Sequence, residues 1–267
     1  MNNNIRFELS FKNIFQLEKK LNFCKLNNIK NINIPCKGLI KKDLFNSTIK
    51  YICKYHNEFN VTYHYSLYHQ YSKNKEKSYQ DFLDFVKSSQ TYKNYEILLV
   101  SGSNKKKNFD SVDVLAYLKK ERNLKVKLGI AYNPYLKKHY NISSERERFE
   151  RKISTGLINS IWFQYGTDIK VLQNEVTYLK KVAKEEKLNL FGSLFIPSKQ
   201  FIARFKFRPW KEVYISEKCL LFLDNFFDFT SDLVSFYKHN NITPVIESDI
   251  SSSQKLDSVY SFLENER

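Results

Sequence analysis

Six short apolar runs recur along the first part of this chain at intervals of about 30 residues, each ending at polar or small residues, and two later runs bring the number to eight. The runs are Ile5–Leu9, Asn31–Pro35, Asn60–Ser66, Glu96–Gly102, Val126–Tyr132, Ile158–Gln164, Leu190–Pro197 and Thr243–Ser248. Runs of this length are typical of buried parallel strands. Eight strands that alternate with helices indicate a barrel whose active site lies at the strand ends.

Between these runs, apolar residues recur every three or four positions, which predicts helices. The first three such segments are Ile14–Cys24, Leu44–Cys53 and Phe82–Val86. Three later segments carry start signals: Asp110 or Ser111 before Val112–Arg122, Ser144 with Glu147 at capping-box spacing for a helix to Ser154, and Thr167 or Asp168 before Ile169–Lys187. This alternation predicts a parallel sheet with right-handed crossovers.

The whole chain, 1–267, therefore reads as one α/β domain, a single (β/α)8 TIM barrel. Pro and Gly are sparse, and no low-complexity linker divides the sequence. The segment 198–225 is irregular, because Arg208-Pro209-Trp210 would end any helix that reaches it. We expect the seventh unit to carry an extra helix or a long loop there.

The chain is strongly basic, with 44 Lys and Arg against 28 Asp and Glu and a formal net charge of +16. Clustered cations bind nucleic acid through counterion release. Here the lysines are spread through every predicted helix, and Lys105-Lys106-Lys107 is the only tight triplet. A Lys- and Asn-rich composition gives the same excess without a partner, so we expect no nucleic-acid binding, although anionic small molecules such as nucleotides or polyglutamates would still be attracted.

No apolar stretch reaches the roughly 18 residues that a membrane-spanning helix needs. The N-terminal Met-Asn-Asn-Asn-Ile-Arg has neither a signal-peptide core nor a basic amphipathic presequence, so we expect a cytoplasmic protein without a membrane partner. Cys24, Cys36, Cys53 and Cys219 form no Cys-x-x-Cys pair, so we expect buried free thiols, and no metal-ligand spacing is found.

Common catalytic and nucleotide-binding motifs are missing from the sequence. It has no Gly-x-Ser-x-Gly elbow for a nucleophilic serine. It also has no Walker-type loop and no Gly-x-Gly-x-x-Gly fingerprint, so nucleotide binding by those modes has no support.

The polar residues at the predicted strand ends are the candidates for chemistry, because those positions face the substrate in a barrel. They are Glu8, Pro35-Cys36, His64, Ser66, Ser101-Gly102-Ser103, Tyr132-Asn133, Gln164, Ser193, Glu247 and Asp249. Glu8 lies between Phe7 and Leu9, where a carboxylate is costly unless it is paired or protonated, and a protonated carboxyl suits a general acid. A solvated carboxylate at a frayed first strand stays open as the other interpretation. His64, among several tyrosines, is as consistent with a packed ring as with a ligand.

Seven segments over residues 5–200 together resemble a known family. They are Phe7-Glu8-Leu9-Ser10, His64-Tyr65-Ser66-Leu67, Leu99-Val100-Ser101-Gly102-Ser103, Ala131-Tyr132-Asn133, Arg151-Lys152-Ile153-Ser154-Thr155-Gly156, Trp162-Phe163-Gln164 and Phe191-Gly192-Ser193-Leu194-Phe195-Ile196-Pro197-Ser198. In this order they resemble the motifs of the methylenetetrahydrofolate reductase family, flavin-dependent barrels that reduce methylenetetrahydrofolate to methyltetrahydrofolate in one-carbon metabolism.

The resemblance implies roles for single residues. Glu8 corresponds to the general acid that helps open the five-membered ring of the folate, and Gln164 to a residue that contacts the folate. His64, Ser103, Tyr132 and Lys152 correspond to the cofactor-binding positions. The implied cofactor is FAD, the implied reductant is NADH or NADPH, and the implied substrate is a folate. The oligomeric state stays open, a homo-oligomer included.

Several positions depart from the family pattern. Ser103 and Ser101 replace the Asp and the Arg of an Arg-Gly-Asp motif, and Pro35 replaces a Thr of the second strand. Leu136 stands where the family has a His after its Ala-Tyr-Pro motif. Because several of these positions contact the flavin in the family, an alternative is a divergent barrel that binds folate without flavin chemistry or acts as a partner or regulatory protein.

Overall fold

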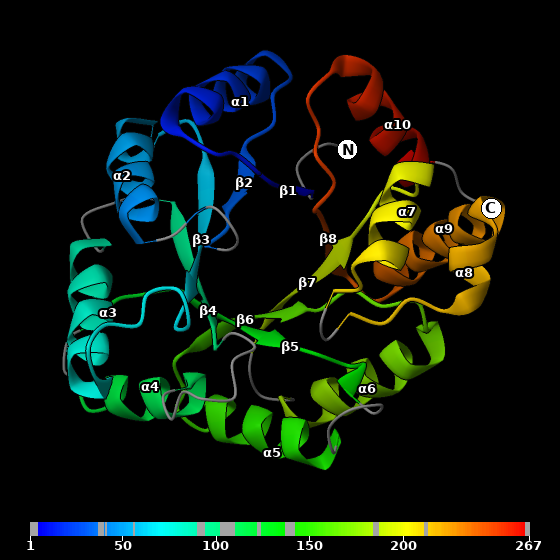
Figure 1. The fold of residues 1–267 in the computed structure, drawn as a ribbon. Coiled ribbons are helices and arrows are strands. Elements are labelled where there is room, and N and C mark those ends of the chain that lie inside the picture. The colour runs from blue at the N-terminus through cyan, green and yellow to red at the C-terminus, as the bar shows by residue number, and fades with distance from the viewer. Residues whose placement is uncertain are drawn as a thin grey trace.

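Eight parallel strands close into a barrel in the computed structural model, with helices around its outside (Figure 1). The structure describes residues 5–36, 40, 42–55, 57–89, 94–101, 110–121, 124–136, 142–183, 187–210 and 213–264. The strands are β1 (Arg6–Glu8), β2 (Asn31–Ile34), β3 (Asn60–Ser66), β4 (Tyr95–Val100), β5 (Leu128–Tyr132), β6 (Ile158–Phe163), β7 (Asn189–Leu194) and β8 (Ile242–Ile246). All eight predicted strands are confirmed, and pairing of β1 with β8 closes the sheet.

The helices alternate with the strands as the apolar spacing predicts. They are α1 (Ile14–Leu26), α2 (Lys42–Ile52) with a 3-10 turn at Cys53–Tyr55, α3 (Lys75–Ser89), α4 (Ser111–Leu118), α5 (Ile142–Ile153), α6 (Ile169–Val182), α7 (Lys199–Phe207), α8 (Glu217–Leu221), α9 (Leu223–His239) and α10 (Ser253–Glu264). Asp110 and Asp168 are the N-caps of α4 and α6, because each carboxylate accepts backbone N–H bonds of the first turn.

Three predicted helix limits are wrong. Ser144 does not cap α5, which begins two residues earlier at Ile142, since Ser-x-x-Glu spacing marks a first turn without fixing its first residue. The fourth helix ends at Leu118, before Arg122. The sixth ends at Val182, before Lys187, where its apolar stripe also ends.

The expected extra element of the seventh unit is present. After β7 the chain forms α7, which ends at Phe207 directly before Arg208 and Pro209, and then the short helix α8 before the long helix α9. Ser198 caps α7 by accepting the backbone N–H of Phe201. α7 lies near the segment that follows β8, since residues of both line one cavity.

Buried polar groups fill the inside of the barrel at its N-terminal end. The Arg6 guanidinium donates to Asn33 Oδ1 at 2.7 Å and to the carbonyl of Ile32 at 2.9 Å. It also lies over the Trp162 and Phe191 rings, which stack with centroids 4.0 Å apart. Burial lowers the pKa of Arg6 to about 10, and the negative charge of Glu96 opposes that shift. These contacts close the barrel below the strand ends.

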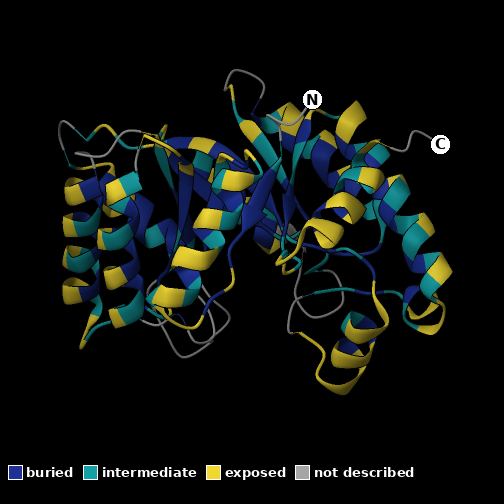
Figure 2. Cartoon of the chain, turned by 90° about the horizontal axis from the view of Figure 1, so that it is seen from above, coloured by how far each residue is buried: buried dark blue, intermediate teal, exposed yellow. Residues whose placement is uncertain are grey.

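The hydrophobic core lies between the sheet and the helices. Figure 2 shows buried residues along the strands and exposed residues on the outer turns of the helices. Ile32, Ile130, Phe45 and Phe226 are completely buried in this layer. Within the described part of the chain, none of the helices has the length and apolar content to cross a lipid bilayer.

Candidate functional site

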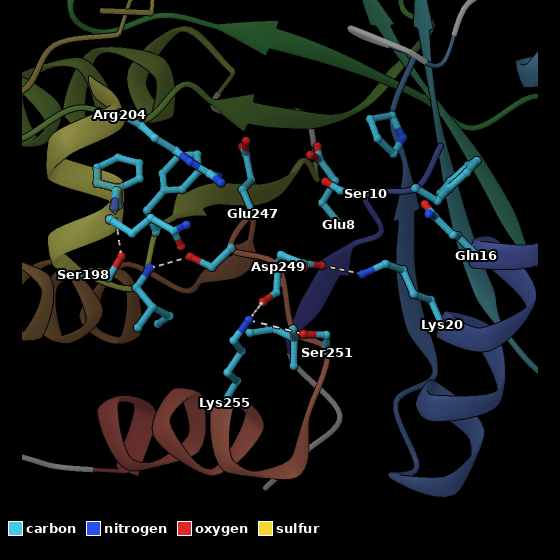
Figure 3. Close-up of a pocket in the computed structure, with 18 of the residues that line it drawn as sticks. Glu8, Ser10, Gln16, Lys20, Ser198, Arg204, Glu247, Asp249, Ser251 and Lys255 are labelled. Carbon is cyan, nitrogen blue, oxygen red and sulfur yellow. Dashed lines mark hydrogen bonds and ion pairs between the residues drawn. The ribbon is translucent and has the colours of Figure 1, made fainter. Parts of the chain in front are cut away.

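A cavity of about 1040 Å³ opens at the C-terminal ends of β1, β7 and β8 (Figure 3). Three kinds of side chain line it. The carboxylates are Glu8, Glu247 and Asp249; the aromatic rings include Phe11, Phe23, Phe195, Phe201 and Trp210; the cations are Lys12, Lys19, Lys20, Arg204 and Lys255. Glu8 is buried, whereas most of the cations are exposed. We call the five cations the cationic rim.

Glu8 is the last residue of β1 and points to the inside of the barrel, like Arg6 two residues before it. Its side chain is only 2% exposed, and its Oε2 lies 3.6 Å from Nδ1 of His64 on β3. The two residues that the resemblance links to acid catalysis and to the cofactor are thus neighbours.

The protonation of the His64 ring follows from its other neighbour. Asn33 accepts from Arg6 through Oδ1, so its amide nitrogen must point to His64, whose Nε2 lies 2.9 Å away. Because an amide nitrogen can only donate, His64 Nε2 accepts. A neutral His64 therefore carries its proton on Nδ1, facing Glu8.

Two further carboxylates follow β8. Ser193 on β7 donates its hydroxyl to Glu247 Oε1. Asp249 pairs with Lys20 of α1, and its carbonyl accepts from Lys255 of α10 at 3.4 Å (Figure 3). Asp249 thus contacts two cations of the rim, Lys20 through its carboxylate and Lys255 through its backbone carbonyl, whereas the Glu247 carboxylate accepts from a neutral hydroxyl.

Three rings, which we call the aromatic wall, cover the side of the cavity formed by β7 and α7. Ring centroids are 5.2 Å apart for Phe195 and Phe201, 5.3 Å for Phe195 and Trp210, and 5.5 Å for Phe201 and Trp210. Trp210 is 40% exposed at the edge of this cluster. A flat apolar ligand would gain stacking contacts there.

The remaining predicted site residues lie elsewhere. Gln164 continues β6, with its backbone N–H bonded to the Tyr132 carbonyl at 2.9 Å, and it is half-buried outside the cavity lining. The side chain of Tyr132 points out of the barrel and donates to Glu175 on α6 at 2.5 Å. Burial and this carboxylate raise the pKa of Tyr132. The structure therefore brings together Glu8 and His64 but not Gln164 or Tyr132.

Lys152 is buried on α5, outside the strand layer, near the charges of Glu145, Arg148 and Asp110. Burial lowers the pKa of Lys152, an effect that Glu145 opposes. Ser101 bonds Ser111 at the start of α4, and Ser103 lies outside the described residues.

These placements bear on FAD. Of the described residues that the resemblance links to the cofactor, only His64 faces the inside of the barrel, whereas Tyr132 faces α6 and Lys152 is buried on α5. The residues present do not fit a flavin held in that way. The described residues also contain no group of three or more His, Cys, Asp and Glu that could hold a metal ion.

The cationic rim and most of the aromatic wall were not predicted from the sequence. Lys12, Lys20 and Lys255 belong to a set of 44 basic residues, and no local pattern separates them from solvated lysines. Glu247 and Asp249 could be selected from the sequence because they lie at the end of the eighth apolar run and directly after it.

The sequence matches no protein-family model and no curated protein. Among solved structures, the chain is similar to an uncharacterized protein from Clostridium thermocellum that binds two copies of 5-methyl-5,6,7,8-tetrahydrofolic acid. The TM-score is 0.63 and the identity 11%, over 97% of this chain and 93% of that chain. It is also similar to the catalytic domain of a hyperthermophilic chitinase from Pyrococcus furiosus, with a TM-score of 0.52 and 13% identity over 91% and 83% of the chains. The likeness is one of fold. At these identities it establishes the (β/α)8 barrel alone.

Proposed function

We propose that this chain binds a reduced folate in the cavity at the C-terminal end of its barrel. The observation that carries the proposal is the composition of one cavity, which combines the buried carboxylate of Glu8 and the half-buried one of Glu247 with an aromatic wall and a cationic rim. A folate offers groups that match these three kinds of side chain. Along its length it has a ring with N–H donors for the carboxylates, an aromatic aminobenzoyl group for the aromatic wall and glutamate carboxylates for the cationic rim. The volume of about 1040 Å³ is ample for a ligand of this size.

The similar barrel from Clostridium thermocellum supports this ligand class, since it binds 5-methyl-5,6,7,8-tetrahydrofolic acid. The chitinase likeness supports no sugar chemistry here, because the rim cations match a polyanionic ligand better than a neutral oligosaccharide. The cavity lining is thus the main support for a folate ligand, and the similar barrel from Clostridium thermocellum is the second.

A second function is favoured by the pairing of Glu8 with His64. We propose that the chain reduces 5,10-methylenetetrahydrofolate to 5-methyltetrahydrofolate with a reduced nicotinamide. Protonated Glu8 would donate its proton to N10, and the bond between N10 and the methylene carbon would break. The N5 lone pair would form an iminium, and hydride from the nicotinamide would convert the methylene into a methyl group. The Nδ1–H of His64 would then face the carboxylate that is left.

FAD, if it were bound, would supply a hydride carrier between the nicotinamide and the folate. A folate-binding protein without turnover, with a partner or regulatory role, is the alternative to the reductase. The two differ only in turnover, so one preparation can distinguish them.

The test is a calorimetric titration of the purified protein with 5-methyltetrahydrofolate, followed by an assay of NADH and NADPH oxidation that depends on methylenetetrahydrofolate, with and without added FAD. We expect saturable binding and folate-dependent oxidation. Binding without oxidation would leave the folate-binding function and refute the reductase. No binding at any attainable concentration would refute both.

A further inference from the structure

Glu247 is the neighbour of Glu8 across the seam that closes the barrel. Arg6 pairs with Val245 and Phe7 with Ile246, so the next pair along the two parallel strands is Glu8 and Glu247. Cross-strand partners share a face of the sheet, and adjacent strands lie about 4.8 Å apart. Both side chains therefore enter the cavity from adjoining positions, as Figure 3 shows.

Contacts with β7 hold Glu247 in place. Its backbone N–H donates to the Leu194 carbonyl at 3.0 Å, and its Oε1 accepts from the Ser193 hydroxyl. Ser193 is itself fixed, because the Tyr237 hydroxyl donates to its carbonyl at 2.9 Å. Gly192 allows that approach, since a Cβ there would lie 2.3 Å from Tyr237 Cζ. The carboxylate is thus positioned before any ligand enters.

The two carboxylates that follow β8 have different partners. Asp249 pairs with Lys20 and its carbonyl accepts from Lys255, so it serves the cationic rim. Glu247 lies deeper, with the neutral Ser193 hydroxyl on one of its oxygens. An inward carboxylate favours a ligand that presents N–H donors and repels a ligand that presents an acid.

We propose that Glu247 is a specificity-determining residue that accepts hydrogen bonds from the amino-pyrimidine edge of the ligand ring. This inference rests on the proposed folate binding. A hydrogen bond to Glu247 would set the orientation of the ligand in the cavity. The ring would lie beside Glu8 and Glu247, and the glutamate carboxylates would extend to the rim at Lys12, Lys20 and Lys255. A pterin offers its 2-amino group and N3–H side by side, which suits a carboxylate.

The test compares wild type and E247Q for two probes, 5-methyltetrahydrofolate and p-aminobenzoylglutamate, which has the tail but no pterin ring. Gln keeps the shape of Glu but loses the charge and one acceptor. We expect E247Q to bind 5-methyltetrahydrofolate about tenfold to hundredfold more weakly, because hydrogen bonds to a charged group are the stronger kind. We expect its affinity for p-aminobenzoylglutamate to stay within about threefold.

Two matched variants complete the design. S193A keeps the Glu247 carboxylate but removes the hydroxyl that donates to it. This variant should therefore lose less affinity for 5-methyltetrahydrofolate than E247Q does. E76Q changes an exposed Glu of α3 and should bind like wild type. Circular dichroism and thermal melting establish that each variant is folded.

The outcomes separate the two proposals. If wild type binds 5-methyltetrahydrofolate and folded E247Q binds it equally well, or loses both probes to the same extent, the role of Glu247 is refuted and folate binding stands. If wild type binds neither probe, the proposed function and this inference fall together.

Discussion

His64 turns Nδ1 toward the buried carboxylate of Glu8, with 3.6 Å between Nδ1 and Oε2. Asn33 fixes that orientation from the far side of the ring, and Arg6 fixes Asn33. A chain of contacts thus runs from the closed N-terminal end of the barrel to the acid at its open end.

Replacing Glu8 tests the acid directly. E8Q removes the transferable proton and keeps the shape of the side chain, so we expect folate-dependent NADH or NADPH oxidation to fall by about 10²- to 10⁴-fold. Affinity for 5-methyltetrahydrofolate should change little, and E76Q is the control. A rate above about a tenth of wild type would remove Glu8 from the acid role.

The position of the ligand can be followed by fluorescence. The chain has two tryptophans, of which Trp162 is buried inside the barrel and Trp210 borders the cavity. Ligand that stacks on the aromatic wall should change the emission of Trp210. In W210F that change should disappear while calorimetric affinity stays within about threefold, because Phe keeps an apolar ring. An unaltered response in W210F would mean that the ligand binds elsewhere.

Asn33 should matter for stability. N33A removes an acceptor from the buried Arg6 guanidinium and a donor from His64, so the free energy of unfolding should fall by about 1–3 kcal/mol in urea titrations. N60A is the matched control, because the Asn60 side chain bonds Asn31 in an exposed position. That change should stay within about 0.5 kcal/mol. Equal losses in both variants would contradict a special role for Asn33.

Lys152 should make stability depend on pH. Burial lowers its pKa in the folded state below the ordinary 10.5, so between those two values the unfolded chain binds more protons. The free energy of unfolding should therefore rise with pH through that interval. Urea titrations across this range should show the rise in wild type and a smaller rise in K152M. K87M, at an exposed position on α3, should behave like wild type. An unchanged slope in K152M would assign the effect to other groups.

The flavin content of the purified protein tests whether FAD binds, as the family resemblance implies, or does not bind, as the placement of Tyr132 and Lys152 indicates. Because Tyr132 faces α6 and Lys152 is buried on α5, we expect protein purified from cells to lack the visible absorbance band of a flavin and to gain none after incubation with FAD. The measurement is an absorbance spectrum before and after gel filtration. A yellow protein that retains FAD would contradict this prediction and favour the flavin-dependent reductase.

The sequence by itself determined the barrel and the location of its chemistry. Parallel strands buried on both sides appear as continuous apolar runs, and their spacing and number specify eight strand–helix units. The polar residues near the end of each run then lie at the open end, which is how Glu8, His64 and Glu247 could be selected.

Only the tertiary structure decided which of these residues meet. Strand alternation turns Tyr132 outward and Glu8 inward, and a shift of one residue reverses that choice. Lys152 is on a helix, and the packing of that helix buried it. The cationic rim joins Lys12 and Lys20 to Lys255, near opposite ends of the sequence, because β1 and β8 are neighbours only once the barrel is closed.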